Sequence, residues 1–162
     1  MEREQRRPGS NRRPFRRDDF DNPNIQKIIS EVEQKLRDAI QPEVLKGLNS
    51  FERKLIHRHF DRNQSFKTRT YREGEEFILC IYPVGNLERF AREKAQHSLD
   101  TGEEVDLPPM GSFERYVVHN ALKDMAGIET SSHGEGEQRH IQIVSKRFGR
   151  GLKKIVKKIK LF

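Results

Sequence analysis

Two pairs of side chains combine an arginine and a histidine four residues apart. Arg53 and His57 form the first pair, and Arg115 and His119 form the second. On a helix, residues four apart share one face. A guanidinium can bind a phosphate through two parallel donors or stack on a nucleobase, and a histidine one turn away can also donate to a phosphate or stack. The pairs are therefore candidate contacts for a nucleic acid.

A structural interpretation competes with this one. A single Arg-x-x-x-His spacing is most often solvated helix surface. The arginine could bridge to a nearby acid, and the histidine could hydrogen-bond within its own domain. Two instances inside a longer repeat favour the functional interpretation.

The repeat extends well beyond the two pairs. A shift of 62 residues aligns S-F-E-R-K-L-I-H with S-F-E-R-Y-V-V-H, and residues 49–83 then match 111–145 at 10 of 35 positions without a gap. The identities include Thr68 with Thr130 and Ile81 with Ile143. Two copies of about 60 residues favour tandem domains rather than a solenoid.

Each copy predicts the order helix, helix, hairpin. Apolar spacing and turn residues place helices at about 25–40, 51–62, 87–100 and 113–125, and strands at 66–71, 77–82, 129–133 and 139–145. Because a hairpin alone is marginally stable, the helices must pack on it. The fold class is α+β, with two tandem small domains, each of two helices on a small antiparallel sheet.

The second helix of each copy has a predicted cap and two predicted faces. Ser50 and Ser112 look like the N-cap residues, which puts Arg53 and Arg115 at the third helical position. Apolar residues from Phe51 and from Phe113 onward form the side that would contact the sheet. The Arg–His side is predicted to point away from the sheet.

The charge is divided unevenly along the chain. Residues 1–17 hold seven arginines and two glutamates, and residues 146–162 hold eight lysines or arginines and no acid. Residues 18–145 hold 17 basic and 23 acidic residues, so the net charge of +7 comes from the two ends. We expect residues 1–24 to be a disordered Arg-rich arm that attracts phosphates or is simply solvated.

We expect the C-terminal segment 148–162 to be a basic amphipathic tail. Leu152, Ile155, Val156, Ile159 and Phe162 share one helical stripe flanked by lysines. This stripe could pack on a neighbouring unit. Residues 151–162 could instead lie on an anionic membrane surface or a protein partner, or fold only on meeting nucleic acid.

The second copy resembles a known module. L-P-P-M, F-E-R-Y-V-V-H and T-S-S-H-G-E-G-E-Q-R-H-I-Q-I together resemble the R3H domain of bacterial Jag-type RNA-binding proteins. The resemblance implies two helices on a three-stranded sheet, association with single-stranded nucleic acid, a signature pair at Arg115 and His119, and a basic residue at Arg139. The domain is expected at 85–147.

The first copy, at 25–84, resembles the same module more distantly. It keeps Arg53 and His57 but has no L-P-P-M, and it carries Phe77 where the second copy has Arg139. Its second helix adds a further basic residue, Arg58, to the candidate contacts. We find no convincing GXXG loop of the KH domain that usually accompanies R3H in Jag-type proteins.

No catalytic constellation, cofactor loop or metal-ligand spacing is evident in the sequence, so we expect no enzyme, no cofactor and no metal site. The single cysteine, Cys80, is expected in a core strand.

The leading hypothesis is a non-catalytic, cytoplasmic binder of single-stranded nucleic acid, RNA more than DNA. The expected contacts are the basic ends and six residues: Arg53, His57, Arg58, Arg115, His119 and Arg139. The alternative is a protein-interaction or membrane-surface adaptor anchored through its C-terminal segment.

Overall fold

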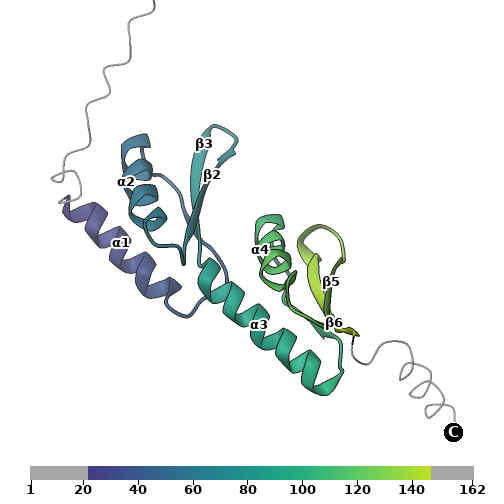
Figure 1. The fold of residues 1–162 in the computed structure, drawn as a ribbon. Coiled ribbons are helices and arrows are strands. Elements are labelled where there is room, and N and C mark those ends of the chain that lie inside the picture. The colour runs from purple at the N-terminus through teal and green to yellow at the C-terminus, as the bar shows by residue number, and fades with distance from the viewer. Residues whose placement is uncertain (1–21, 147–162) are drawn as a thin grey trace, which may run out of the picture.

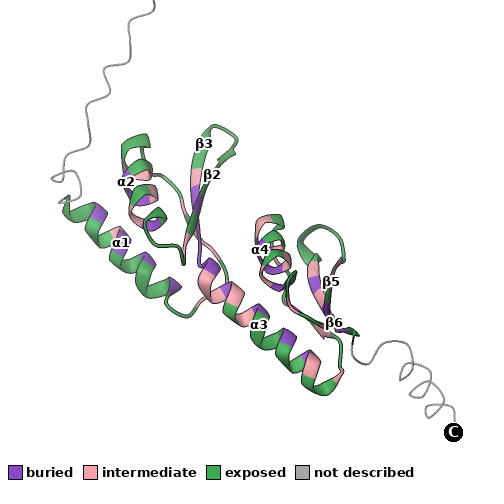
Figure 2. Ribbon diagram, viewed as in Figure 1, coloured by how far each residue is buried: buried purple, intermediate pink, exposed green. Residues whose placement is uncertain are grey.

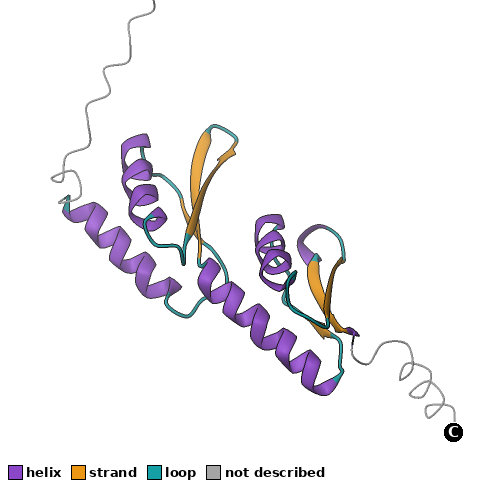
Figure 3. Cartoon of the chain, in the orientation of Figure 1, coloured by secondary structure: helices purple, strands orange, loops and turns teal. Residues whose placement is uncertain are grey.

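The computed structural model describes residues 22–146, which form an α+β structure with four α-helices and two small antiparallel sheets (Figures 1 and 3). The elements are α1 Pro23–Leu36, β1 Glu43–Leu45, α2 Ser50–Asp61, β2 Lys67–Glu73, β3 Glu76–Tyr82, α3 Val84–Thr101, β4 Val105–Asp106, α4 Ser112–Leu122, β5 Ile128–His133, the 3-10 turn η2 Gly136–Gln138 and β6 His140–Ser145. We call 22–83 the N-terminal half and 84–146 the C-terminal half.

The predictions for the two basic ends fall almost wholly outside the described residues. The tail at 148–162 lies beyond them, and so does the arm at 1–24 except for its last three residues. Those three residues differ from the prediction, because Asn22 caps α1 and Pro23 begins it. Asn22 accepts a hydrogen bond from the backbone N–H of Asn24 (3.0 Å), and a proline at the first helical position needs no hydrogen-bond partner for its nitrogen.

The two halves repeat one topology in one register. The strand orders are β1-β3-β2 and β4-β6-β5, with every pair antiparallel. Cys80 of β3 lies between Val44 and Arg69. A shift of 62 residues turns these pairings into Gln142 between Asp106 and Ser131, which are the pairings observed. The repeat seen in the sequence is therefore also a repeat of the hydrogen-bond register.

The third strand of each sheet was not predicted from the residue pattern. β1 has three residues and β4 has two, and such short strands show no usable alternation of apolar and polar residues. The predicted hairpins are present with their ends shifted by a few residues. The first helix is shorter than predicted, because α1 ends at Leu36 rather than near residue 40.

The N-terminal half has its own apolar core on one face of its sheet. The buried side of α1 carries Ile25, Ile29, Val32 and Leu36, whose spacing of three and four residues produces the buried stripe in Figure 2. This stripe packs against residues of α2 and of β3. The members on these two elements are Leu55, Ile56, Phe60, Leu79 and Ile81.

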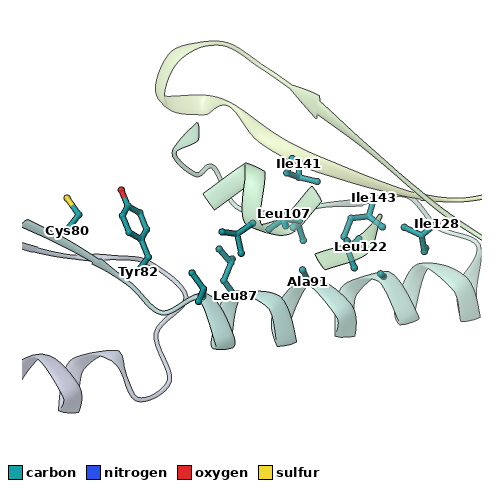
Figure 4. Packing of buried hydrophobic residues seen from close by; sticks show 13 residues of the cluster. Cys80, Tyr82, Leu87, Ala91, Leu107, Leu122, Ile128, Ile141 and Ile143 are labelled. Atoms are coloured by element: carbon teal, nitrogen blue, oxygen red, sulfur yellow. The ribbon is translucent and has the colours of Figure 1, made fainter. Parts of the chain in front are cut away.

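Strand β3 contributes to both cores because its side chains alternate between the two faces of the sheet. Leu79 and Ile81 belong to the core just described, whereas Cys80 and Tyr82 belong to the core of the C-terminal half. Figure 4 shows Cys80 and Tyr82 at one end of that second core, with Tyr82 on the side of Leu87 and Leu107 and Cys80 farther out. Cys80 is 5% exposed, which confirms the expectation that it lies in a core strand.

A single amide side chain ties the end of α1 to the beginning of α3. The Asn86 Nδ2 atom donates to the backbone carbonyls of Leu36 (2.9 Å), Arg37 (3.1 Å) and Ala39 (3.0 Å). Carbonyls at a helix C-terminus have no partner within the helix, so Asn86 satisfies groups that would otherwise need water. This links the helix of one half to that of the other.

Among residues 22–146, no helix is both long enough and apolar enough to cross a membrane.

We predict that Asn86→Ala lowers the free energy of unfolding by about 1–3 kcal/mol, because partly buried carbonyls lose their donor. Urea unfolding followed by circular dichroism measures this. Gln96→Ala is the matched control, since the Gln96 amide on the same helix bonds to the exposed Asp100. Equal stabilities of the two variants would contradict the proposed role of Asn86.

Candidate nucleic-acid interface

The helices that carry the Arg–His pairs begin one residue earlier than predicted. Asn49 caps α2 and accepts hydrogen bonds from the N–H groups of Phe51 and Glu52, both at 2.9 Å. The Glu52 carboxylate in turn accepts the Asn49 N–H (2.8 Å), which completes a capping box. The prediction that Ser50 is the cap was therefore wrong, because a better acceptor directly precedes it.

The helix α4 begins in a related way without a capping side chain. Its N-cap is Gly111, not Ser112 as predicted, and the Glu114 carboxylate accepts the Gly111 N–H (2.8 Å). Glu114 is 7% exposed. Burial raises the pKa of Glu114, while the Gly111 N–H and the Arg115 guanidinium oppose that rise. The third helical position therefore holds a glutamate, and Arg115 follows it by one residue.

The two signature arginines make the same bond in both halves. Arg53 Nη1 donates to the Leu48 carbonyl (2.6 Å), and Arg115 Nη1 donates to the Met110 carbonyl (2.7 Å). Each acceptor lies five residues before its arginine, in the connector that leads into the helix. This bond folds the guanidinium back over the helix start, so its position is fixed before any ligand binds.

The two signature histidines are also fixed by matching bonds. His57 Nδ1 lies 2.5 Å from Thr68 Oγ1, and His119 Nδ1 lies 2.7 Å from Thr130 Oγ1. Thr68 lies on β2 and Thr130 on β5. The prediction that the Arg–His side points away from the sheet was therefore wrong, because each histidine reaches the outer strand of its own sheet. The engaged atom is Nδ1, so Nε2 is the atom with which either ring could contact a ligand.

Sequence reasoning singled out the histidines but not their threonine partners. The signal was nevertheless present, because Thr68 and Thr130 are among the identities of the repeat. Each threonine follows its histidine at the same distance in the sequence and lies on the strand after the helix. Such a conserved spacing between the two copies is expected when both copies form the same hydrogen bond.

The surroundings of the two histidines differ. In the N-terminal half, Asp61 Oδ2 lies 2.7 Å from His57 Nδ1, and Asp61 Oδ1 accepts the Thr68 hydroxyl (2.9 Å). The position equivalent to Asp61 in the C-terminal half is Lys123. Within residues 22–146, the two influences on the His119 charge are its burial and Arg115, and no carboxylate is among them. Partial burial, and next the nearby Arg115 charge, lower the pKa of His119 below 6.5.

Arg139 lies close to the signature arginine through a shared neighbour. The Arg139 carbonyl accepts the Met110 N–H (3.1 Å), and the Met110 carbonyl accepts the Arg115 bond. Met110 is therefore hydrogen-bonded to both arginines, to the backbone of Arg139 and to the side chain of Arg115. The Arg139 side chain is exposed. In the N-terminal half the equivalent residue, Phe77, lies under the Arg53 guanidinium, 5.1 Å from ring centre to Cζ.

Arg115 lines a cleft of about 600 Å³ at the start of α4. Glu114 and Glu137 contribute to its wall from the C-terminal half, and Gln41 and Pro42 contribute from the N-terminal half. The cleft therefore combines one signature arginine with residues from both halves.

A second depression, of about 470 Å³, lies along α2 and brings together His57, Arg58 and three neighbours, Lys54, Asp61 and Arg62. The basic members follow one another at intervals of four residues and so share one face of the helix. The equivalent residues of the second half are Tyr116, Asn120 and Asp124. The predicted contact at Arg58 thus belongs to a basic helix face that the second half does not have.

The described part of the chain holds no group of three or more metal-ligating side chains. Burial raises the pKa of the Cys80 thiol, which disfavours the reactive thiolate.

The lowered pKa of His119 predicts a specific dependence on pH. The ring is neutral at pH 7 in the folded protein, whereas an unfolded histidine takes up a proton near pH 6.5. The unfolded state therefore binds more protons, and the stability gained from a neutral His119 is lost as the pH falls below about 6.5. We expect the stability of the wild type to fall more than that of His119→Gln between pH 7.5 and pH 5.5.

An NMR titration of the His119 ring tests the cause directly. Arg115→Gln removes the second of the two influences, so the His119 pKa should rise while staying below 6.5. A midpoint at or above 6.5 in the wild type would contradict the structural origin of the shift.

Comparison with known proteins places the second half in a family. The R3H domain family matches residues 85–145. One relative is the RNA-binding protein KhpB of Bacillus subtilis (strain 168), which is 41% identical over 63 residues. The match covers 38% of this chain and 30% of the relative, so most of the relative has no counterpart in the match. The predicted resemblance is confirmed for this segment, because the R3H domain family matches residues 85–145.

Proposed function

We propose that the protein is a non-catalytic binder of single-stranded nucleic acid, with RNA preferred over DNA. The observation that carries the proposal is the R3H domain at 85–145, together with its similarity to a protein named as RNA-binding. Arg115, His119 and Arg139 would make the contacts of this domain. The proposal includes a cytoplasmic location.

The geometry supports phosphate binding at Arg115. One guanidinium nitrogen is held by Met110, and the side chain is partly exposed where it lines the cleft. A guanidinium has five N–H donors, so donors are left for a ligand after this bond. A group positioned before binding loses less conformational entropy on binding. His119, neutral at pH 7, would contribute a directed hydrogen bond or a stacking surface rather than a charge.

We propose further that 25–84 is a divergent R3H-like domain, related to the R3H domain by duplication. The shared strand register, the two arginine–carbonyl bonds and the two histidine–threonine bonds support this relation. The N-terminal half would bind mainly through charge, because α2 carries the basic face with Arg58. The basic segments 1–24 and 148–162 would add salt-dependent affinity.

We predict that Arg115→Ala in the full chain weakens binding of single-stranded RNA by about 10- to 100-fold, because a charge-assisted contact is lost. The salt dependence should become shallower, by about 0.7 in the log–log slope for one lost phosphate contact. Filter binding to single-stranded RNA, single-stranded DNA and duplex at two salt concentrations measures both effects.

Arg92→Ala on α3 is the matched control for that experiment, since it removes one exposed arginine from a different helix. Arg115→Lys separates charge from geometry, because lysine keeps the charge but not the planar donor fork. The same loss of affinity for Arg92→Ala and Arg115→Ala would mean that only net charge matters, and the proposed role of Arg115 would be refuted.

The arginine of the first half should contribute less. The Arg53 guanidinium is already engaged by the Leu48 carbonyl and by the Phe77 ring. We expect Arg53→Ala to weaken RNA binding by less than about 10-fold, below the range for a lost charge-assisted contact. The double variant Phe77→Arg/Arg53→Ala has an arginine at the position equivalent to Arg139. Its affinity for RNA should therefore be higher than that of Arg53→Ala alone. An Arg53→Ala effect larger than that of Arg115→Ala would show that the first half is the main binding site.

A further inference from the structure

The three tyrosines of the chain belong to one row of aromatic rings that crosses from one half to the other. The Tyr71 and Tyr82 hydroxyls lie 3.0 Å apart. The Tyr82 ring meets the Phe113 ring edge to face, with centres 4.7 Å apart, and the Phe113 and Tyr116 rings are nearly parallel with centres 6.4 Å apart. We call these four residues the aromatic row.

The row follows from the register of the first sheet. Tyr71 and Tyr82 lie on neighbouring strands, and both point to the face of the sheet opposite to its helices α1 and α2. That face is where the start of α4 packs, which brings Phe113 onto Tyr82. Phe51, the equivalent of Phe113 in the first half, is 46% exposed. The row is therefore a product of the contact between the halves rather than of the repeated unit.

Burial is uneven along the row. Tyr82 is 8% exposed, and burial is the main cause that raises its pKa. Tyr71 is 38% exposed and Tyr116 is 63% exposed. The two middle rings, Tyr82 and Phe113, thus form the contact between the halves. The exposed Tyr116 ring is not needed for this contact.

Cationic side chains accompany the row. The Arg69 guanidinium lies over the Phe113 ring, with Cζ 4.1 Å from the ring centre. Arg69 is exposed and lies on the same face of β2 as Tyr71, and the exposed Lys67 continues that face. Exposed aromatic rings beside exposed cations match single-stranded nucleic acid, whose bases stack on rings while its phosphates pair with the cations.

We propose that the two exposed ends of the aromatic row form a base-stacking platform, on which a single strand passes from Tyr116 of the R3H domain to Tyr71 and Arg69 of the first half. This inference rests on the proposed function and adds the path of the strand and the dependence on both halves. Basic residues on the β2 side favour this occupant over an apolar protein surface, because an apolar partner would have to bury Lys67 and Arg69 without compensation.

The absence of tryptophan provides a direct readout, since the intrinsic fluorescence of the protein comes from these three tyrosines. Titration of the full chain with single-stranded oligoribonucleotides should quench tyrosine fluorescence. Tyr116→Leu should weaken binding by roughly 5- to 150-fold, the range for loss of one stacked base. Tyr116→Phe keeps the ring and should bind like the wild type. Tyr71→Leu tests the far end of the row and should also weaken binding.

Two controls make the result specific to bases. Phe51→Leu removes an exposed ring outside the row and should not change affinity. An abasic oligonucleotide keeps the phosphates but has no rings to stack, so Tyr116→Leu and the wild type should bind it equally.

The outcomes separate the two proposals. Wild-type affinity of Tyr116→Leu, with Arg115→Ala still impaired, would overturn the platform and leave the proposed function intact. An effect of Tyr116→Leu but not of Tyr71→Leu would overturn the path across both halves. No binding of any single-stranded oligonucleotide by the wild type would overturn the proposed function and the platform together.

Discussion

The alternation of side chains along β3 is the constraint on which the described structure depends. Leu79 and Ile81 complete the core beneath α1 and α2, while Cys80 and Tyr82 on the opposite face enter the core of the R3H domain. A one-residue change of register would exchange these sets and disrupt both cores at once. Because β3 is the central strand of its sheet, its position is fixed by neighbours on both sides and on both faces.

The same constraint explains why the two arginine–histidine pairs are not equivalent, although their bonds match. The start of α4 packs on the outer face of the first sheet, so Phe113 is partly covered and Arg115 lines a cleft shared by both halves. At the start of α2 the matching ring is exposed, and Arg53 lies over Phe77 instead. Identical local sequences thus acquire different surroundings from their order along the chain.

Much of the fold could be predicted from the sequence because its signals are local or repeated. Helical spacing located α1 through residues such as Ile25 and Ile29, and the offset of 62 residues anticipated the common register of the two hairpins. The residue pattern did not locate strands β1 and β4, although the family resemblance implied a third strand, because a strand of two or three residues is defined by its partner rather than by its own pattern.

The candidate site was less predictable, since it depends on contacts that periodicity does not encode. Helical geometry placed Arg115 and His119 on one face correctly. It did not show that this face borders the outer strand, where Thr130 binds His119. The caps were misassigned because Ser50 is preceded by Asn49, whose side chain accepts two backbone bonds. The contact of Arg69 with Phe113 joins strand β2 of the first half to helix α4 of the second, and no pattern within either half points to it.

The distribution of charge makes this local geometry more important than the net charge. The described residues 22–146 hold 20 acidic and 18 basic residues, so this part does not attract a polyanion by its overall field. Attraction there must come from small groups such as the basic face of α2 around Arg58, or from rings whose interaction with bases needs no charge. At about 0.15 M salt, charges more than about 8 Å apart are largely screened, so nearby acids weaken only the groups that they approach closely. The proposed nucleic-acid surface therefore depends on local groups, and the contact between the two halves supplies aromatic rings together with the cation of Arg69.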